Sequence, residues 1–300
     1  MNIVVIGAGA IGSLFGGLLS KRNNVILIGR TTHVQAIKKN GLKITGKTKL
    51  DSKISAEASI KKINFFPELL ILTVKSFDTE TAIKEAKQLI SKNTVVLSLQ
   101  NGLDNMDKIK KYVDYKKIIA GVTTHGALFS KPGIIKHTGK GLTILGELNG
   151  NKTSRINKIV KLFNQAGIQT TASKNITHEI WVKAIINSSI NPLSAIFHCK
   201  NGYLLENPIL EKFVERICEE STNIANANGI RLSHEDMIEK TKEVIRKTSD
   251  NYSSMFQSIE KGKDTEIDSI NGRLVGIGKK YKVGAPLNEA LIYSVKSMIK

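Results

Sequence analysis

Hydrophobic and polar positions follow different periods in the two parts of the chain. From residue 1 to about 170, short apolar runs alternate with stretches of helical periodicity. This alternation predicts a mostly parallel, doubly wound α/β sheet. In the lysine-rich stretch 41–63 the pattern leaves open whether further strands occur. The expected strands are 2–6, 24–28, 69–74, 94–98, 118–123 and 142–145, and the expected helices are 12–21, 78–91 and 153–166.

Beyond about residue 172 the strand signals stop and the pattern becomes helical. Pro192, Pro208 and Pro286 are expected at helix boundaries. We therefore expect an α/β domain over 1–171 and an all-α domain over 172–300, with an active site between them at the carboxyl ends of the strands. The amphipathic stretches are 175–190, 208–228, 233–249, 252–261, 264–280 and 286–299.

The first expected strand leads directly into three glycines with the spacing Gly-x-Gly-x-x-Gly, namely Gly7, Gly9 and Gly12. The first glycine allows a tight turn, the second lets the backbone approach a pyrophosphate, and the third lets the helix pack close to the strand. N–H groups at the helix start face the phosphates, so Ala10 and Ile11 join the expected cofactor contacts. Strand, motif and helix in this order favour a Rossmann-type dinucleotide-binding domain over a glycine turn that only packs.

The end of the second expected strand indicates which dinucleotide binds. NAD enzymes usually place Asp or Glu there to hold the ribose 2′-hydroxyl, whereas this chain has Gly29 and Arg30. A guanidinium can form two hydrogen bonds with a 2′-phosphate. The alternative is a solvated surface arginine. We expect NADP(H) rather than NAD(H), with Arg30 as a cofactor contact.

Composition narrows the classes of function. The net charge of +19 comes mostly from lysines spread along the chain, without an arginine-rich block. This pattern indicates a solvated surface that attracts anionic ligands, rather than a nucleic-acid interface. Two cysteines form no disulfide framework, the histidines show no metal-ligand spacing, and no apolar run is long enough to span a membrane. We expect a cytoplasmic protein without a metal; its oligomeric state stays open, with a homodimer as one candidate.

Polar residues near the ends of the later expected strands are candidates for the active site. Lys75 ends one strand, Asn101 follows the next, and His125 and Ala127 follow a third. The carboxyl ends of parallel strands lie at one edge of a sheet, so these residues are expected near the cofactor. His125 is expected to order its loop rather than to act in catalysis.

The helical part carries a second group of candidates. Lys183, Asn187 and Asn191 are spaced four apart, so they share one face of a helix whose other residues are mostly apolar. Burying such groups without partners is costly, so this face indicates a polar site. The alternative is the solvent face of an ordinary amphipathic helix. Further along, Ser254 lies in Asn-Tyr-Ser-Ser-Met and Glu266 in Asp-Thr-Glu-Ile-Asp-Ser-Ile-Asn-Gly; taken alone, Glu266 would be a surface carboxylate.

Together these motifs resemble the ketopantoate reductase family, the 2-dehydropantoate 2-reductases of pantothenate and coenzyme A biosynthesis. The resemblance runs from residue 7 to residue 272, in family order and with compatible spacing. It implies an N-terminal NADP-binding Rossmann domain, a C-terminal all-helical domain, and hydride transfer from NADPH to C2 of ketopantoate to give (R)-pantoate. The motifs are Gly-x-Gly-x-x-Gly, Leu-Thr-Val-Lys75, Gln-Asn101-Gly, Thr-Thr-His125, Trp-x-Lys183-x-x-x-Asn187-x-x-x-Asn191-Pro, Ser-Ser254-Met and Thr-Glu266-Ile-Asp-x-Ile-Asn-Gly.

The resemblance also implies roles for single residues. Lys183 matches the catalytic general acid, and Glu266 matches the acid that binds the substrate hydroxyl and meets the cofactor. Asn101 matches a residue that touches both cofactor and substrate. Asp78 departs from members with glutamine there and is left out, because its carboxylate should not face a phosphate. The other substrate-binding matches are Asn187, Asn191, Asn201 and Ser254, and the other cofactor-binding matches are Arg30, Lys75 and Ala127.

The chemistry of the reaction agrees with these roles. Hydride addition to a ketone builds an alkoxide, which a protonated lysine can stabilise and protonate. Two alternatives stay open: a related reductase of another branched 2-oxo acid, and an NADP(H)-sensing protein without turnover. Lys183, Asn187 and Glu266 together argue against a sensor, which needs none of them.

Overall fold

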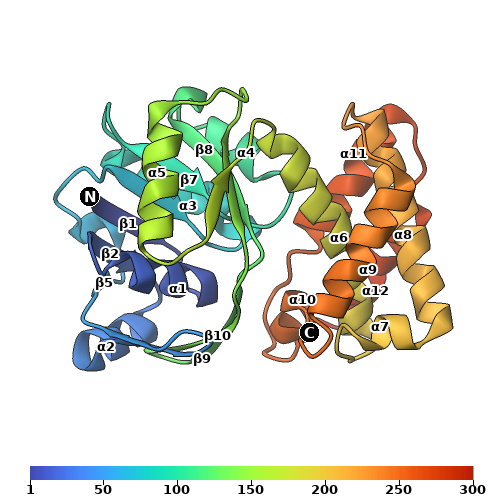
Figure 1. The fold of residues 1–300 in the computed structure, drawn as a ribbon, viewed down its shortest axis with the longest axis horizontal. Coiled ribbons are helices and arrows are strands. Elements are labelled where there is room, and N and C mark those ends of the chain that lie inside the picture. Colours follow the sequence, from blue (N-terminus) through green and yellow to red (C-terminus); the bar gives the residue numbers. More distant parts are fainter. Residues whose placement is uncertain (300) are drawn as a thin grey trace. The chain divides into compact units, whose positions relative to one another are not determined.

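The computed structural model describes residues 1–299, which form two compact units (Figure 1). The N-terminal unit contains Met1–Gln100 and Asn105–Thr177. The helical unit contains Asn101–Asp104 and the chain from His178 onward. The domain boundary that we expect after residue 171 remains a prediction. The units of the structure divide slightly later, and neither is continuous in sequence.

The N-terminal unit is built on an eight-stranded sheet with the order β12-β11-β8-β7-β6-β1-β2-β5. Neighbouring strands run parallel except for β11, which is antiparallel to β8. This topology confirms the doubly wound α/β fold. The strands are β1 (Asn2–Ile6), β2 (Asn24–Ile28), β5 (Ser55–Glu57), β6 (Leu69–Leu72), β7 (Val95–Ser98), β8 (Ile118–Thr123), β11 (Thr143–Glu147) and β12 (Thr170–Ala172).

Helices cover both faces of this sheet, which explains why its central strands are uninterrupted apolar runs. On one face, α1 (Ala10–Leu19) and α5 (Ser154–Gln165) pack against one set of strand residues, which includes Val5. On the other face, α3 (Thr79–Ala86) and α4 (Asn105–Lys110) pack against the alternate set. Because successive strand residues point to opposite faces, each strand contributes to both cores.

A second, four-stranded sheet accounts for the lysine-rich stretch that the sequence pattern leaves open. Its order is β4-β3-β10-β9, and it packs on the α1 side of the main sheet together with α2 (Thr31–Asn40). Further strands therefore do occur within 41–63, and one of them, β5, joins the main sheet instead. The strands of the second sheet are β3 (Leu42–Gly46), β4 (Leu50–Ser52), β9 (Gly126–Lys131) and β10 (Ile134–Gly139).

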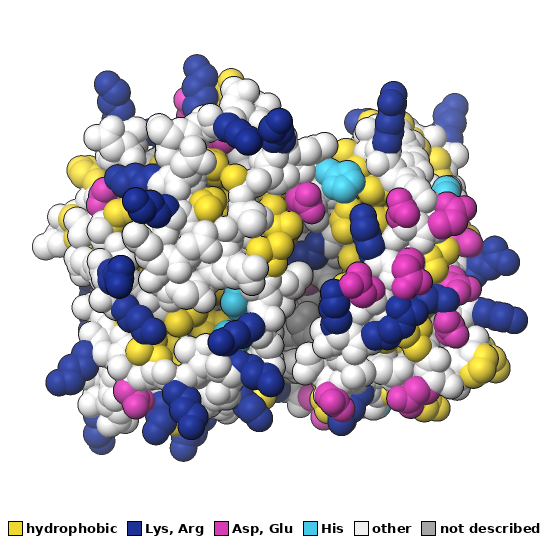
Figure 2. All heavy atoms as spheres, viewed as in Figure 1, with side chains coloured by type: hydrophobic (Ala, Val, Ile, Leu, Met, Phe, Trp, Pro, Cys, Tyr) yellow, Lys and Arg dark blue, Asp and Glu magenta, His cyan; other side chains and the backbone are white. Residues whose placement is uncertain are grey.

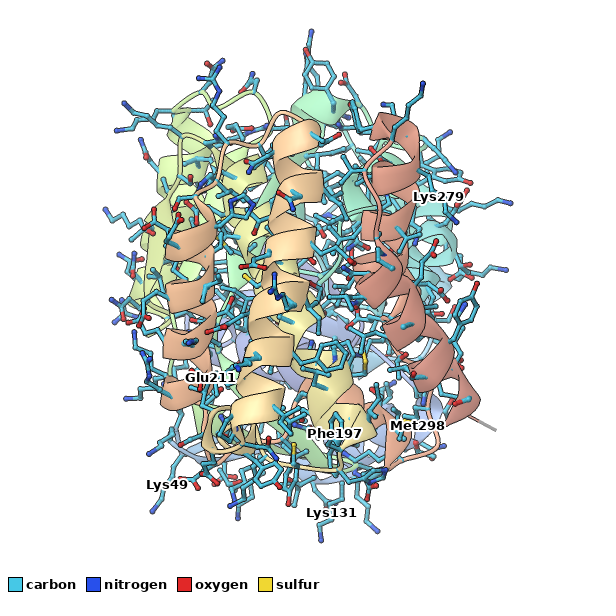
Figure 3. The ribbon with its side chains drawn as sticks, turned by 90° about the vertical axis from the view of Figure 1, so that its right-hand side faces the viewer. Lys49, Lys131, Phe197, Glu211, Lys279 and Met298 are labelled. Atoms are coloured by element: carbon cyan, nitrogen blue, oxygen red, sulfur yellow. The ribbon has the colours of Figure 1, made fainter. Side chains whose placement is uncertain are left out.

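The helical unit is arranged around one long helix, α6 (Ile176–Ile196). Residues along α6, from Trp181 to Ala195, contribute to all three apolar clusters of this unit. Figure 3 looks onto this unit, with Glu211 on α8, Lys279 on α11 and Met298 just beyond α12 labelled. The other helices are α7 (Tyr203–Glu206), α8 (Pro208–Ala227), α9 (His234–Lys247), α10 (Ser254–Ile259), α11 (Arg273–Tyr281) and α12 (Pro286–Ser297).

Two expectations about helices are wrong. We expect Pro192 at a helix boundary, but α6 continues through it to Ile196. Proline leaves the Ser188 carbonyl without its usual backbone donor. The Asn271 side chain donates to this carbonyl instead, with an Nδ2–O distance of 3.2 Å. We also expect a single helix over 264–280, but a π-helical turn precedes α11 at Asp268–Gly272.

The remaining helix boundaries shift by a few residues. The helix expected over 12–21 begins earlier, at Ala10. The one expected over 78–91 is regular only in α3, with short 3-10 turns before and after it. Within residues 1–299, no helix is long and apolar enough to cross a membrane, and no group of three or more His, Cys, Asp or Glu side chains is placed to hold a metal ion.

Candidate active site

The glycine motif forms the turn between β1 and α1, and two of its glycines are required by space. Gly7 has φ +102°, and a Cβ there would lie 2.5 Å from the Val74 backbone nitrogen. A Cβ at Gly12 would collide with the Gly7 carbonyl and the Thr73 hydroxyl. A side chain at either position would therefore push the helix away from the sheet.

Gly9 differs from the other two glycines, because space in front of it is open. A Cβ there would meet only the Gly7 carbonyl oxygen, at 3.9 Å. Gly9 is also the N-cap of α1, where no side chain caps the helix and the first turn, which includes Ala10 and Ile11, holds no acidic residue. The first N–H groups of a helix have no acceptor within it, so this start fits the phosphates of a dinucleotide.

Arg30 and Lys75 lie at the same edge of the sheet as the glycine turn. They follow β2 and β6, the two strands that flank β1. Arg30 is exposed and Lys75 is half-buried. On the adjoining strand, the Glu57 carboxylate lies 2.6 Å from the Lys38 ammonium, so its charge is compensated. This edge can therefore receive an anionic group.

His125 and Ala127 lie at the start of β9, within the N-terminal unit. His125 is buried, and its Nδ1 lies 3.2 Å from Nε2 of His137. The other ring nitrogen of His137, Nδ1, lies 2.9 Å from the Thr48 hydroxyl. Burial, together with the neighbouring His137, lowers the pKa of His125 to about 4. A neutral, buried imidazole in this chain fits the expectation that His125 orders its loop. Ala127 is half-buried beside the core under α1.

Lys183, Glu266 and Asn101 come together within the helical unit. Glu266 is only 6% exposed, and Asn101 donates from Nδ2 to its Oε2 at 3.4 Å. Burial lowers the pKa of Lys183 to about 8, and the charge of Glu266 acts in the opposite direction. A lysine in this range can both hold and release a proton near neutral pH.

Asn101 reaches Glu266 because the segment Asn101–Asp104 belongs to the helical unit, although it follows β7 of the main sheet. The Leu103 N–H donates to the Ser269 carbonyl at 3.0 Å, and the Leu103 side chain packs in the cluster around Trp181. No local pattern in the sequence indicates this placement. The residue pattern puts Asn101 only at the sheet edge, and the expectation that it also touches the substrate comes from the family resemblance alone.

The four other expected substrate residues all lie in the helical unit. Asn187 is half-buried and Asn191 is buried, both on α6. Ser254 is exposed at the first position of α10, and the residue before it, Ser253, donates to the Asn191 carbonyl at 3.3 Å. This hydrogen bond holds the start of α10 against α6. It ties Ser254 to the part of α6 that carries Asn191.

Asn201 is buried and held firmly. Its Nδ2 donates to the Thr248 hydroxyl at 2.9 Å, and its backbone N–H donates to the Asn251 carbonyl at 2.9 Å. Its Oδ1 is buried and has no hydrogen-bond partner among the described residues 1–299. Such an oxygen can accept from a ligand donor.

Sequence reasoning misses three buried side chains that support these residues. They are Ser253, Asn271 and Asn288. Asn271 and Asn288 are hydrogen-bonded to each other at 2.9 Å. The interior proline of α6 is the one signal that could have pointed to Asn271, because it requires a substitute donor for the Ser188 carbonyl.

Comparison with known proteins places these features in a family. The family described as ketopantoate reductase PanE/ApbA matches residues 3–150, and the family described as ketopantoate reductase PanE/ApbA C terminal matches residues 175–298. A 2-dehydropantoate 2-reductase from Pyrococcus abyssi (strain GE5 / Orsay) is 42% identical over 289 residues, which cover 96% of this chain and 94% of that protein.

Two solved structures are also similar over almost the whole chain. A D-mandelate dehydrogenase in ternary complex with NADH and anilino(oxo)acetate has a TM-score of 0.94 and 31% identity, covering 99% of this chain and 98% of that one. A PanE/ApbA family ketopantoate reductase from Ralstonia eutropha JMP134 has a TM-score of 0.91 and 30% identity, with the same coverage.

Proposed function

Because this chain belongs to the ketopantoate reductase family, we propose that it reduces 2-dehydropantoate (ketopantoate) to (R)-pantoate, with NADPH as hydride donor. The product would enter pantothenate and coenzyme A biosynthesis. The observation that carries the proposal is the group of Lys183, Glu266 and Asn101 in the helical unit, with the pKa of Lys183 lowered to about 8.

Lys183 is the general acid of the proposed reaction. When bound, the nicotinamide cofactor supplies a hydride to C2 of the ketone. The Lys183 ammonium gives its proton to the ketone oxygen, so the carbonyl becomes a hydroxyl and the amine is left neutral. A cation at this oxygen also stabilises the negative charge that develops there. The pKa of about 8 supports this role, because most of the amine is still protonated at neutral pH.

Glu266 has the role of orienting the substrate through its hydroxyl group. A buried carboxylate accepts a hydrogen bond from a hydroxyl but repels a second carboxylate. The substrate acid group would therefore meet neutral donors. The amides and hydroxyl assigned to that task are Asn187, Asn191, Asn201 and Ser254, with Asn101 between Glu266 and the cofactor.

The cofactor is assigned to the glycine turn and the flanking strand ends. The open space at Gly9 and the uncapped start of α1 fit a pyrophosphate, which the N–H groups of Ala10, Ile11 and Gly12 would hold. Arg30 and Lys75 would meet the 2′-phosphate. Ala127 and Glu266 complete the expected contacts.

A second candidate function has its own support. The similarity to a D-mandelate dehydrogenase solved with NADH and anilino(oxo)acetate favours a related reductase of another 2-oxo acid, and NADH as an alternative donor. A protein that only senses NADP(H) is the third candidate.

Loss of NADPH absorbance with purified protein and ketopantoate tests the proposal. Parallel assays use NADH as donor and a panel of 2-oxo acids that includes phenylglyoxylate, the oxidised form of mandelate. NADPH-preferring turnover of ketopantoate is the expected result. Faster turnover of phenylglyoxylate would favour the second candidate, and NADPH binding without any turnover would favour the sensor.

Compartment and assembly are also part of the proposal. We place the protein in the cytoplasm, which the free thiols of Cys199 and Cys218 support, since free cysteines are typical of a reducing compartment. We also propose a homodimer. The helical unit exposes the large side chains Ile209 and Tyr293 (78% and 73%), which a partner copy would cover. Cell fractionation and light scattering test the two statements.

A further inference from the structure

The long helix of the helical unit contains a proline well inside it. α6 runs from Ile176 to Ile196, and Pro192 lies in its last turns. Proline has no backbone N–H, so it cannot donate to the carbonyl four residues earlier, which belongs to Ser188. Ser188 is completely buried, and water cannot easily replace the missing donor.

Asn271 supplies the missing hydrogen bond from a different part of the chain. Its Nδ2 lies 3.2 Å from the Ser188 carbonyl oxygen, and its side chain is completely buried. Asn271 belongs to the π-helical turn Asp268–Gly272, in which the Gly272 N–H donates to the Ile267 carbonyl at 2.9 Å. A π turn inserts one extra residue into a helix, and such turns are frequent at functional sites.

A ring of buried polar groups engages Nδ2 of Asn271, while its Oδ1 is buried and has no hydrogen-bond partner among the described residues 1–299. Its Nδ2 also donates to Oδ1 of Asn288 at 2.9 Å. Asn288 donates in turn to Glu220 at 2.8 Å and to the Ser221 hydroxyl at 3.2 Å. The Ser221 hydroxyl lies 3.1 Å from that of Ser188, so the ring returns to α6. Networks of this kind orient their members strongly, because each unmade hydrogen bond is costly in the interior.

The interrupted turn of α6 coincides with two expected substrate residues. Asn187 directly precedes Ser188, and Asn191 directly precedes Pro192. The relative orientation of the two amides therefore depends on how α6 is held at this point. Glu266 lies five residues before Asn271, just ahead of the π-helical turn Asp268–Gly272. One buried amide thus links α6 to the segment that holds Glu266, the expected partner of the substrate hydroxyl.

We propose that Asn271 is a positioning residue, which donates the hydrogen bond that Pro192 cannot and thereby orients Asn187 and Asn191 toward the substrate. This inference rests on the proposed function, because it takes Asn187 and Asn191 as substrate-binding. Asn271 itself touches the backbone of α6 and other buried groups, so its effect reaches the substrate through them.

The test compares N271L, P192A and the double variant P192A/N271L with the wild type. N271L removes the donor and keeps the branched shape of the side chain, although its methyl groups are larger than the amide atoms that they replace. P192A restores a backbone N–H at position 192, which can donate to the Ser188 carbonyl. We expect N271L to raise the KM for ketopantoate about 10-fold, since small misplacements of positioning groups have effects of at least this size. The KM for NADPH should change less than 2-fold, and P192A/N271L should recover both the KM for ketopantoate and most of the lost Tm.

Several outcomes would overturn the proposal. If Asn271 only stabilised the fold, N271L would lower the fraction of active enzyme, and with it the apparent kcat, and would leave both KM values unchanged. Absence of recovery in P192A/N271L would mean that the Ser188 carbonyl is not the reason for Asn271. If N271L does not fold but the double variant does, that recovery is the expected result; if neither folds, the proposal fails. Absence of ketopantoate turnover by the wild type would instead contradict the proposed function, while recovery of Tm still tests the link between Asn271 and Pro192.

Discussion

The two units of the molecule differ sharply in charge. The whole excess of 19 positive charges lies in the N-terminal unit, which has 28 Lys and Arg against 9 Asp and Glu. The helical unit has 17 of each. On the face shown in Figure 2, basic side chains are spread over the N-terminal unit with few acidic ones, whereas both signs are mixed on the helical unit. A general positive field suits the attraction of an anionic dinucleotide.

The interiors of the two units differ as well. The N-terminal unit buries layered apolar residues and, among amides, only Asn105. The helical unit buries four asparagines, namely Asn191, Asn201, Asn271 and Asn288, together with Glu266. The N-terminal unit offers backbone and surface charge to a cofactor. The helical unit instead offers fixed polar side chains, which recognition of a small substrate requires. Under the proposed function, the two units would use different physical means of recognition.

The largest expected effect tests the chemical role of the helical unit. Lys183→Ala should lower kcat by about 10² to 10⁴, because the general acid is lost. Steady-state kinetics with NADPH and ketopantoate measure it, and Lys247→Ala, an exposed lysine on α9, is the matched control. Near-normal turnover of Lys183→Ala would show that Lys183 is not the general acid, and it would weaken the contrast between the units.

Acid should destabilise the N-terminal unit through its buried histidines. The pKa of His125 is lowered from 6.5 to about 4, so the unfolded chain takes up a proton at a pH where the folded chain does not. The contribution of His125 to the free energy of unfolding should therefore be constant above about pH 7 and fall between about 6.5 and 4, by roughly 3 kcal/mol. Denaturant titrations across this range measure it.

The same titration on His125→Gln tests this assignment, and the variant should show a flatter pH dependence. His234→Gln changes a histidine outside this cluster, and this control should keep the wild-type pH dependence. His137 and His33 have pKa values lowered mainly by burial, so part of the dependence should remain in His125→Gln. An identical slope in His125→Gln would contradict the assignment to His125.

Arg30→Ala tests how the N-terminal unit binds the cofactor. NADPH binding should weaken by about 1.5 to 3 kcal/mol, the range for a hydrogen bond to a charged group, while NADH binding should change little. Fluorescence titration with both dinucleotides measures this, and Arg22→Ala, another exposed arginine of the N-terminal unit, is the control. If Arg30→Ala weakened the binding of NADPH and NADH equally, Arg30 would contribute only to the general positive field of the unit.

The smallest expected effect is a pH dependence of the reaction. Lys183, with a pKa of about 8, must be protonated to act as an acid. In the direction of ketone reduction, kcat/KM should be level below about pH 8 and then fall about tenfold per pH unit. Pantoate oxidation should show the opposite trend. A profile for reduction that stays level to pH 10 would exclude Lys183 as the group that titrates.

Much of this molecule can be predicted from local patterns. Continuous apolar strands and the glycine turn are short-range signals, so β1, α1 and the cofactor edge follow from the residues themselves. Lys183, Asn187 and Asn191 follow from their spacing on one helix face. Pro192 predicts a helix boundary that does not occur, and the donor to the Ser188 carbonyl, Asn271, lies far away in sequence. Local patterns predict neither the π turn nor the placement of Asn101 beside Glu266, since both depend on tertiary contacts; only the family resemblance implies that Asn101 and Glu266 meet the same ligands.

The short segment Asn101–Asp104 limits how freely the two halves of this chain can be exchanged with the corresponding halves of a relative. A chimera joined near Thr177 would carry this segment from one parent and the helices that receive it from the other. Leu103 and Asn101 would then meet a foreign cluster and a foreign carboxylate. Recombination between relatives should succeed only when this segment is inherited with its own helices, so the two halves are expected to diverge together.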